Sequence, residues 1–267
     1  MRIALGLEYD GTRYLGWQSQ PGGRTVQDVL ERAIGAIAGE AARVVCAGRT
    51  DTGVHARGQV VHFDTSADRP DSAWVKGVNT HLPFDIAVQW SARVPDAFHA
   101  RFSAELRRYD YFVLNRPVRS ALDVTTMGWF HAPLDLARMR AGATHLLGEH
   151  DFSAFRSAEC QAKSPVRILH RLDIGRHGDV FQFTLEANAF LHHMVRNIVG
   201  CLVYVGKGKH PSEWLAELLA QRTRALAAPT FSPCGLYLSR VHYGAGWALP
   251  AFPTIPSLSL ATCTEPG

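Results

Sequence analysis

The alternation of apolar and polar positions divides the chain into short strands and a smaller number of helices. Residues 3–9 alternate with a period of two, as a half-buried strand does. After Thr25, apolar residues recur every three or four positions, which predicts a helix from Val26 to about Ala38 with Thr25 as its cap. The same reasoning predicts strands near 43–47, 59–65, 85–94, 104–114, 166–175, 179–188 and 235–243, and helices near 72–79, 134–147, 190–205 and 212–221.

These elements form two runs of strands and helices, with few β-α-β alternations of regular length. This order favours an α+β fold with a mainly antiparallel sheet, and each run fits a split β-α-β unit of the ferredoxin-like or RRM-like kind. We place the boundary after Leu106, giving halves at 1–106 and 107–248. From Leu249 onward the chain has four prolines and no Lys or Arg, so residues 249–267 are expected to form an irregular tail.

Composition narrows the class of protein. With 46% hydrophobic and 19% charged residues, the chain can build a substantial core. A formal net charge of +4 permits a polyanionic partner without requiring one. Five widely spread cysteines fit reduced thiols in the cytoplasm, and no apolar run reaches the roughly 20 residues of a membrane helix. No Cys, His and carboxylate set has metal-ligand spacing, so we expect no metal site.

The run from Gly48 to Ala56 carries the strongest chemical signal. It places Asp51 between Arg49 and a glycine turn, on a loop between two predicted strands. Reacting side chains are typical of loops held by such a scaffold. Asp-Thr-Gly taken alone is more often only a turn, because Asp and Gly favour turns for backbone reasons. These three residues therefore leave a catalytic and a structural interpretation open.

The complete nonapeptide, Gly-Arg-Thr-Asp-Thr-Gly-Val-His-Ala, resembles the catalytic motif of the TruA family of tRNA pseudouridine synthases. Other blocks resemble the family in the family's own order and together span nearly the whole chain. They are Leu7–Gly11, Tyr14–Gln18, Gln59–Phe63, Phe98–Ser103, Arg108–Tyr111, Asn188–Gly200 and Gly235–Leu238.

The resemblance implies a fold and an activity. The fold is pseudouridine-synthase-like, with two α/β halves facing each other across a central cleft and their sheets joined. The activity is isomerisation of uridine to pseudouridine at positions 38–40 of the tRNA anticodon stem-loop, by a homodimer. The reaction rejoins the sugar C1′ to C5 of the same base, so no cofactor is expected.

The resemblance also implies roles near Asp51. Asp51 is the essential residue, as nucleophile or general base, and the sequence does not distinguish the two routes. Arg49 takes part in flipping the base out of the stem, and in an extended loop its guanidinium would lie on the same side as Asp51. Arg196 is expected to pair with Asp51 and lower its pKa. Periodicity alone favours a solvated face of the 190–205 helix for Arg196 and its neighbours His192, His193 and Asn197.

Further residues are expected to contact the substrate. Tyr109 is expected to stack on the uracil, although a pair of tyrosines in a strand is more often core. Leu236 and Leu238 are expected to supply an apolar wall. Resemblance places tRNA contacts at Phe98, His99, Ala100, Arg101 and Phe102, and at Glu159, Cys160, Gln161, Ala162 and Lys163. Other candidates for phosphate contacts are Arg107, Arg108 and Arg167.

Two alternatives compete with this interpretation. An aspartic protease built on Asp51-Thr52-Gly53 would need a second carboxylate sharing a proton, which only a homodimer could supply here. A non-catalytic RNA-binding module would keep basic and aromatic residues but would not require Asp51.

Overall fold

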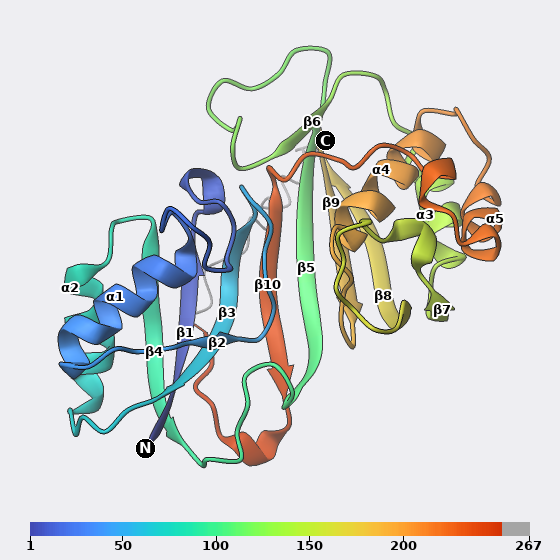
Figure 1. Ribbon diagram of the computed structural model, residues 1–267. Coiled ribbons are helices and arrows are strands. Elements are labelled where there is room, and N and C mark those ends of the chain that lie inside the picture. The colour runs from blue at the N-terminus through green and yellow to red at the C-terminus, as the bar shows by residue number, and fades with distance from the viewer. Residues whose placement is uncertain (253–267) are drawn as a thin grey trace, which may run out of the picture.

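The computed structural model describes residues 1–252, which form one ten-stranded sheet flanked by helices (Figure 1). The strand order is β4-β1-β3-β10-β5-β9-β8-β7, with β2 added to β3 and β6 to β5. The β3–β10 and β5–β6 pairs are parallel, and the other pairs are antiparallel. The mainly antiparallel α+β fold predicted from the sequence is confirmed.

The first half contributes four strands, one of them short, and two helices. Its elements are β1 (Arg2–Tyr9), α1 (Val26–Ala38), β2 (Val45–Cys46), β3 (His55–Asp64), α2 (Val78–His81) and β4 (Ile86–Val94). Thr25 caps α1 as predicted, because its side chain accepts a hydrogen bond from the Asp28 N–H. The helix ends at Gly39, whose φ of 74° lies in the left-handed region.

The second half carries the other strands and three helices. Its elements are β5 (Ala104–Asn115), β6 (Gly128–Phe130), α3 (Leu136–Thr144), β7 (Gly148–Asp151), β8 (Val166–His177), β9 (Val180–Ala187), α4 (Met194–Gly206), α5 (Trp214–Gln221) and β10 (Leu236–Tyr243). In Figure 1, α1 and α2 lie on the same side of the sheet as α3, α4 and α5.

The last strand joins the two halves. β10 inserts between β3 and β5, with Leu238 opposite Ala56 on one side and opposite Tyr109 on the other. Gly58 permits the close approach of β3, because a Cβ there would overlap the carbonyl of Ser239. The boundary that we placed after Leu106 falls inside β5, so a continuous strand rather than a linker runs through it.

Several predicted elements differ in extent. The predicted helix near 190–205 begins only at Met194, because His193 adopts a left-handed conformation with φ of 63°. His192 and His193 therefore lie in the turn before α4 and not on its face. The strand near 43–47 shortens to β2, and the helix near 72–79 begins as a π-helical turn at Ala73–Gly77. β6 and β7 are too short to leave a periodic signal.

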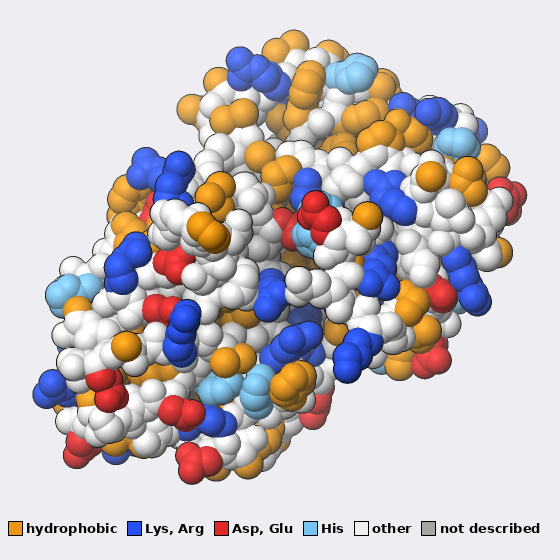
Figure 2. Space-filling model, in the orientation of Figure 1, with side chains coloured by type: hydrophobic (Ala, Val, Ile, Leu, Met, Phe, Trp, Pro, Cys, Tyr) orange, Lys and Arg blue, Asp and Glu red, His pale blue; other side chains and the backbone are white. Residues whose placement is uncertain are grey.

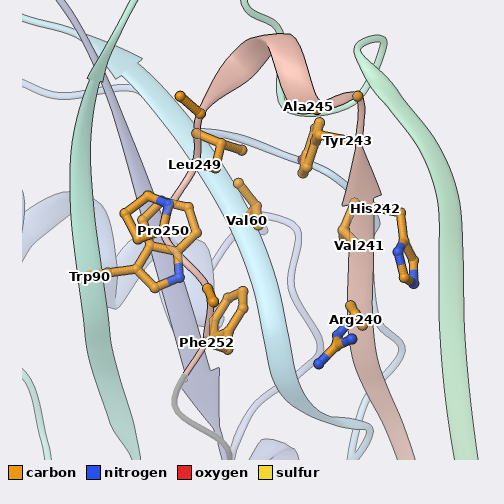
Figure 3. Close-up of a pocket in the computed structure, with 13 residues that line it drawn as sticks. Val60, Trp90, Arg240, Val241, His242, Tyr243, Ala245, Leu249, Pro250 and Phe252 are labelled. Atoms are coloured by element: carbon orange, nitrogen blue, oxygen red, sulfur yellow. The ribbon is translucent and has the colours of Figure 1, made fainter.

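The segment after β10 crosses the opposite side of the sheet from α1 and α2. Phe252 packs edge to face on Trp90 of β4, with ring centroids 5.5 Å apart, and a cavity of about 320 Å³ lies beneath the segment (Figure 3). The start of the predicted tail, up to Phe252, is thus ordered against the sheet, and residues 253–267 lie outside the described part. No helix within residues 1–252 has the length and apolar character needed to cross a membrane.

Candidate active site

Asp51 lies in the loop between β2 and β3, where the two halves meet. The Val54 N–H donates to the Asp51 carbonyl at 3.1 Å and closes the turn. Gly53 within this turn has φ of 77°, a conformation that favours glycine. The Asp-Thr-Gly segment is therefore a turn, and the chain continues from it directly into β3.

Three neighbouring segments hold the loop in place. The Trp17 N–H donates to the carbonyl of Thr50 at 3.0 Å, and the Tyr9 hydroxyl is 2.8 Å from the Thr50 hydroxyl. The Gln59 side chain donates to the Gly48 carbonyl at 2.6 Å. Trp17 and Gln59 are almost fully buried. These contacts give the resemblance blocks around Tyr9, Trp17 and Gln59 a structural role, because they fix Gly48 and Thr50, which come just before Asp51.

The carboxylate of Asp51 is in contact with three side chains from one short segment. Arg196 Nη1 lies 3.1 Å from Asp51 Oδ2, as the resemblance implied. His193 Nε2 lies 3.3 Å from the same oxygen, and His192 Nε2 lies 3.3 Å from Oδ1. The two imidazole rings stand 4.0 Å apart between centroids. Sequence reasoning placed the histidines beside Arg196 but assigned them no role, and the signal available was the adjacent His-His pair itself.

The backbone explains this convergence. The left-handed conformation of His193 turns the chain just before α4, so that both histidines lie beside the first turn of the helix. Arg196 lies in the first turn of α4, and its Nε donates to the Phe231 carbonyl at 2.9 Å. The Arg196 guanidinium is therefore held by two partners, the Phe231 carbonyl and the Asp51 carboxylate.

The charges around Asp51 keep it ionised. Burial opposes ionisation, but contact with His192, His193 and Arg196 outweighs it, and the pKa of the Asp51 carboxyl lies below its usual value. Contact with Asp51 raises the pKa of His192, whereas burial lowers the pKa of His193. A proton shared with Asp51 is therefore held more readily on His192 than on His193.

Asp51, His192 and His193 also offer three donor atoms within 4.8 Å of one another, a spacing compatible with a metal ion. The guanidinium of Arg196, which is 3.1 Å from Asp51, opposes a cation there and already occupies one carboxylate oxygen. We therefore assign no metal to this cluster, and the expectation that the protein needs none stays a prediction.

Tyr109 and the two leucines line the same region. Leu238 pairs with Tyr109 across β10 and β5, and Leu236 pairs with Tyr111. The Tyr109 ring packs edge to face on Phe190 at 5.0 Å, and its hydroxyl lies beside Gly48 in the loop that carries Asp51. Burial raises the pKa of Tyr109 far above that of a free tyrosine.

Arg49 does not pair with Asp51. Its side chain is exposed, and among residues 1–252 the structure gives it no ion pair, so the neighbouring guanidinium expected from the sequence is supplied by Arg196 instead.

The two segments expected to contact tRNA are only partly accessible. Phe98 and Ala100 are fully buried, and the side chain of Phe98 packs on Tyr243. The half-buried His99 accepts the Arg101 and Phe102 N–H groups at 3.2 Å, whereas the Arg101 and Phe102 side chains are exposed. In the second segment Glu159, Gln161 and Lys163 are exposed, while Cys160 and Ala162 are half-buried.

The other arginines expected to contact phosphates bond to groups of the protein itself. Arg107 is buried and donates to the Ala104 and Asn188 carbonyls at 2.9 and 2.8 Å. Arg108 pairs with Asp110, and Arg167 donates to the Ser164 carbonyl. We conclude that Arg107 is structural. Figure 2 shows Lys and Arg side chains gathered along the middle of the helix-bearing face, around histidine and acidic side chains.

Comparison with known proteins identifies the family of the chain. The family model described as tRNA pseudouridine synthase matches residues 7–103 and 143–244. The chain belongs to the tRNA pseudouridine synthase family. It is therefore an isomerase of the class that converts uridine to pseudouridine in tRNA, and the two-half pseudouridine synthase fold applies to it.

Individual relatives are similar over almost their whole length. The chain is 57% identical over 250 residues to tRNA pseudouridine synthase A of Paraburkholderia xenovorans, covering 94% of this chain and 93% of the relative. It is 58% identical to the protein of the same name from Burkholderia thailandensis, with the same coverage. Among solved structures, one chain of a Cbf5-Nop10-Gar1 complex matches at 11% identity with a TM-score of 0.39, covering 88% of this chain and 48% of that one.

Proposed function

We propose that this isomerase acts at positions 38–40 of the tRNA anticodon stem-loop, flips the target uridine out of the stem, and uses Asp51 as nucleophile or general base. Isomerisation breaks the C1′–N1 bond, rotates the uracil and joins C1′ to C5. No atom is gained or lost, so the proposal needs no cofactor. The 58% identical relative carries the name tRNA pseudouridine synthase A, which supports the choice of substrate.

The ion pair between Asp51 and Arg196 is the observation that carries the assignment of Asp51. An ionised carboxylate is needed both to attack a sugar carbon and to accept a proton. Arg196 and the two histidines keep Asp51 ionised although its side chain is only 20% exposed. A structural turn does not require three such partners around one carboxylate.

The arrangement of exposed side chains supports base flipping. Extruding a base from a stem costs a few kcal/mol, which contacts to the extruded base and the remaining stack must offset. Arg49 is exposed at the edge of the catalytic loop and is available to fill the vacated space. The Arg101 guanidinium lies 5.5 Å from the Phe102 ring centroid, and this exposed pair suits phosphate contact and stacking.

The competing readings fit the site less well. An aspartic protease needs two carboxylates sharing one proton, which raises a pKa, whereas the pKa of Asp51 is lowered. An RNA-binding module without catalysis does not need an Asp held by Arg196 and two histidines. Family membership also favours the isomerase.

Release of tritium from uridine labelled at C5 tests the proposal. We expect release from tRNA with a uridine at position 38, 39 or 40, and none when all three are replaced by cytidine. Release that persists after this replacement would place the target outside positions 38–40. A homodimer in the cytoplasm is part of the proposal, and sedimentation of the protein with and without tRNA measures the oligomeric state.

A further inference from the structure

The two carboxylate oxygens of Asp51 have different neighbours. Oδ2 is held by Arg196 Nη1 at 3.1 Å and faces His193 Nε2 at 3.3 Å. Oδ1 faces His192 Nε2 at 3.3 Å, the one polar contact that the structure gives this oxygen among the described residues. Since Oδ2 is held by a fixed guanidinium, Oδ1 is the oxygen with the freedom to react.

A uracil that reacts near Oδ1 must meet His192. Reacting atoms approach to about 3–3.5 Å in a productive complex, the same distance at which the His192 ring already lies. The base must therefore contact this imidazole or displace it. The His192 side chain is also 33% exposed, so the ring connects the buried carboxylate with solvent.

We propose that His192 is a further catalytic residue, the imidazole that takes the C5 proton of the rotated uracil and exchanges it with solvent. The inference rests on the proposed role of Asp51. Once C1′ is bonded to C5, C5 still carries its hydrogen and N1 is an imine nitrogen. The C5–H bond breaks, its electron pair forms the C5–C6 double bond, and N1 takes a proton. His192 accepts one proton and the imidazolium or water supplies one, so the step is proton-neutral.

The other candidates near Asp51 are less suited to this step. The Tyr109 hydroxyl is buried and its raised pKa makes the phenolate scarce at neutral pH. His193 lies on the Oδ2 side with Arg196. The charged and titratable groups that face His192 are Asp51 on its loop, Glu159 and Cys160 on the segment before β8, and the neighbouring His193. Contact with Asp51 raises the pKa of His192, Cys160 and Glu159 add to this rise, and burial opposes it.

The test uses tRNA with deuterium at C5 of the target uridine and the variant His192→Gln. Glutamine can still donate a hydrogen bond to Oδ1 but cannot carry a proton. We expect turnover to fall roughly 10²-fold, the usual contribution of a positioned acid or base. We also expect the ratio of rates with hydrogen and deuterium to rise above that of the parent. His193→Gln is the matched control and should keep the parent's isotope ratio.

A second variant distinguishes a lost proton acceptor from a misfolded site. His192→Ala leaves a space beside Oδ1, and added imidazole should restore part of its turnover. An unchanged isotope ratio in His192→Gln, or no rescue of His192→Ala by imidazole, would overturn the proposed role of His192. Neither result would change the proposed role of Asp51. Product formation by Asp51→Asn would instead overturn the proposed function, so the two failures are distinguishable.

Discussion

Arg196 Nη1 lies 3.1 Å from Asp51 Oδ2, an ion pair between residues 145 positions apart in the sequence. The second anchor of Arg196, its bond to the Phe231 carbonyl, makes the pair rigid. This relationship joins the α4 helix of one half to the Asp51 loop of the other, so the site exists only when both halves are folded together.

Arg196→Ala should lower turnover more than tRNA binding, because the partner of Arg196 is Asp51 and not the RNA. We expect a loss of about 10²-fold in single-turnover rate, as for one positioned electrostatic group. Arg196→Lys should restore only part, since an ammonium cannot bond Asp51 and Phe231 at the same time. Weakened binding with an unchanged rate on bound tRNA would contradict the pairing.

Asp51→Asn should abolish product formation, by roughly 10⁴-fold or more, because the amide can neither attack nor accept a proton. Binding of tRNA should persist, since phosphate contacts supply most of the affinity. Filter binding and tritium release on the same preparation measure the two effects. Turnover near the parent's rate would refute the role of Asp51.

Tyr109→Phe separates stacking from hydroxyl chemistry. The ring remains, so binding should survive, and because its pKa is raised we expect the hydroxyl loss to reduce turnover less than tenfold. The control is Tyr111→Phe on the same strand. The Tyr111 hydroxyl donates to the Ser232 carbonyl, so its removal should cost about 1 kcal/mol of stability. Greater loss of turnover in Tyr111→Phe than in Tyr109→Phe would reverse the assignment.

Acid should weaken the fold through Asp51. Its folded pKa lies below the ordinary value of 3.8, so its stabilising effect is present above that value and is lost as pH falls through the folded pKa. Urea unfolding between about pH 6 and pH 3 should therefore show a smaller drop for Asp51→Asn than for the parent. Equal slopes for the two proteins would mean that Asp51 contributes nothing to acid unfolding.

Gly58→Ala should destabilise the contact between β3 and β10, which joins the two halves. A Cβ at this position would overlap the Ser239 backbone of β10, which cannot move without breaking the pairing. We expect a loss of about 1–3 kcal/mol in the free energy of unfolding, measured by urea titration. Gly246→Ala is the control, because nothing lies within 4 Å of a Cβ there. A stability equal to that of the control would show that β3 and β10 are not closely packed.

The sequence by itself determined the elements whose signals are local. The helix α1 runs from Val26 to Ala38 as predicted, because an apolar stripe and the Thr25 cap act within a few residues of each other. The hairpin of β8 and β9 follows from alternation on both sides of Gly178, whose φ of 57° suits glycine. The Asp51 loop was found because its motif is contiguous.

Only the tertiary structure decided what depends on distant segments. The insertion of β10 between β3 and β5 has no signature in any single stretch, since strand pairing is set by the packing of the whole sheet. The burial of Phe98, Ala100 and Arg107 is likewise a long-range outcome. The placement of His192 against Asp51 depends on one left-handed residue, His193, which the 3.6-residue periodicity around it cannot reveal.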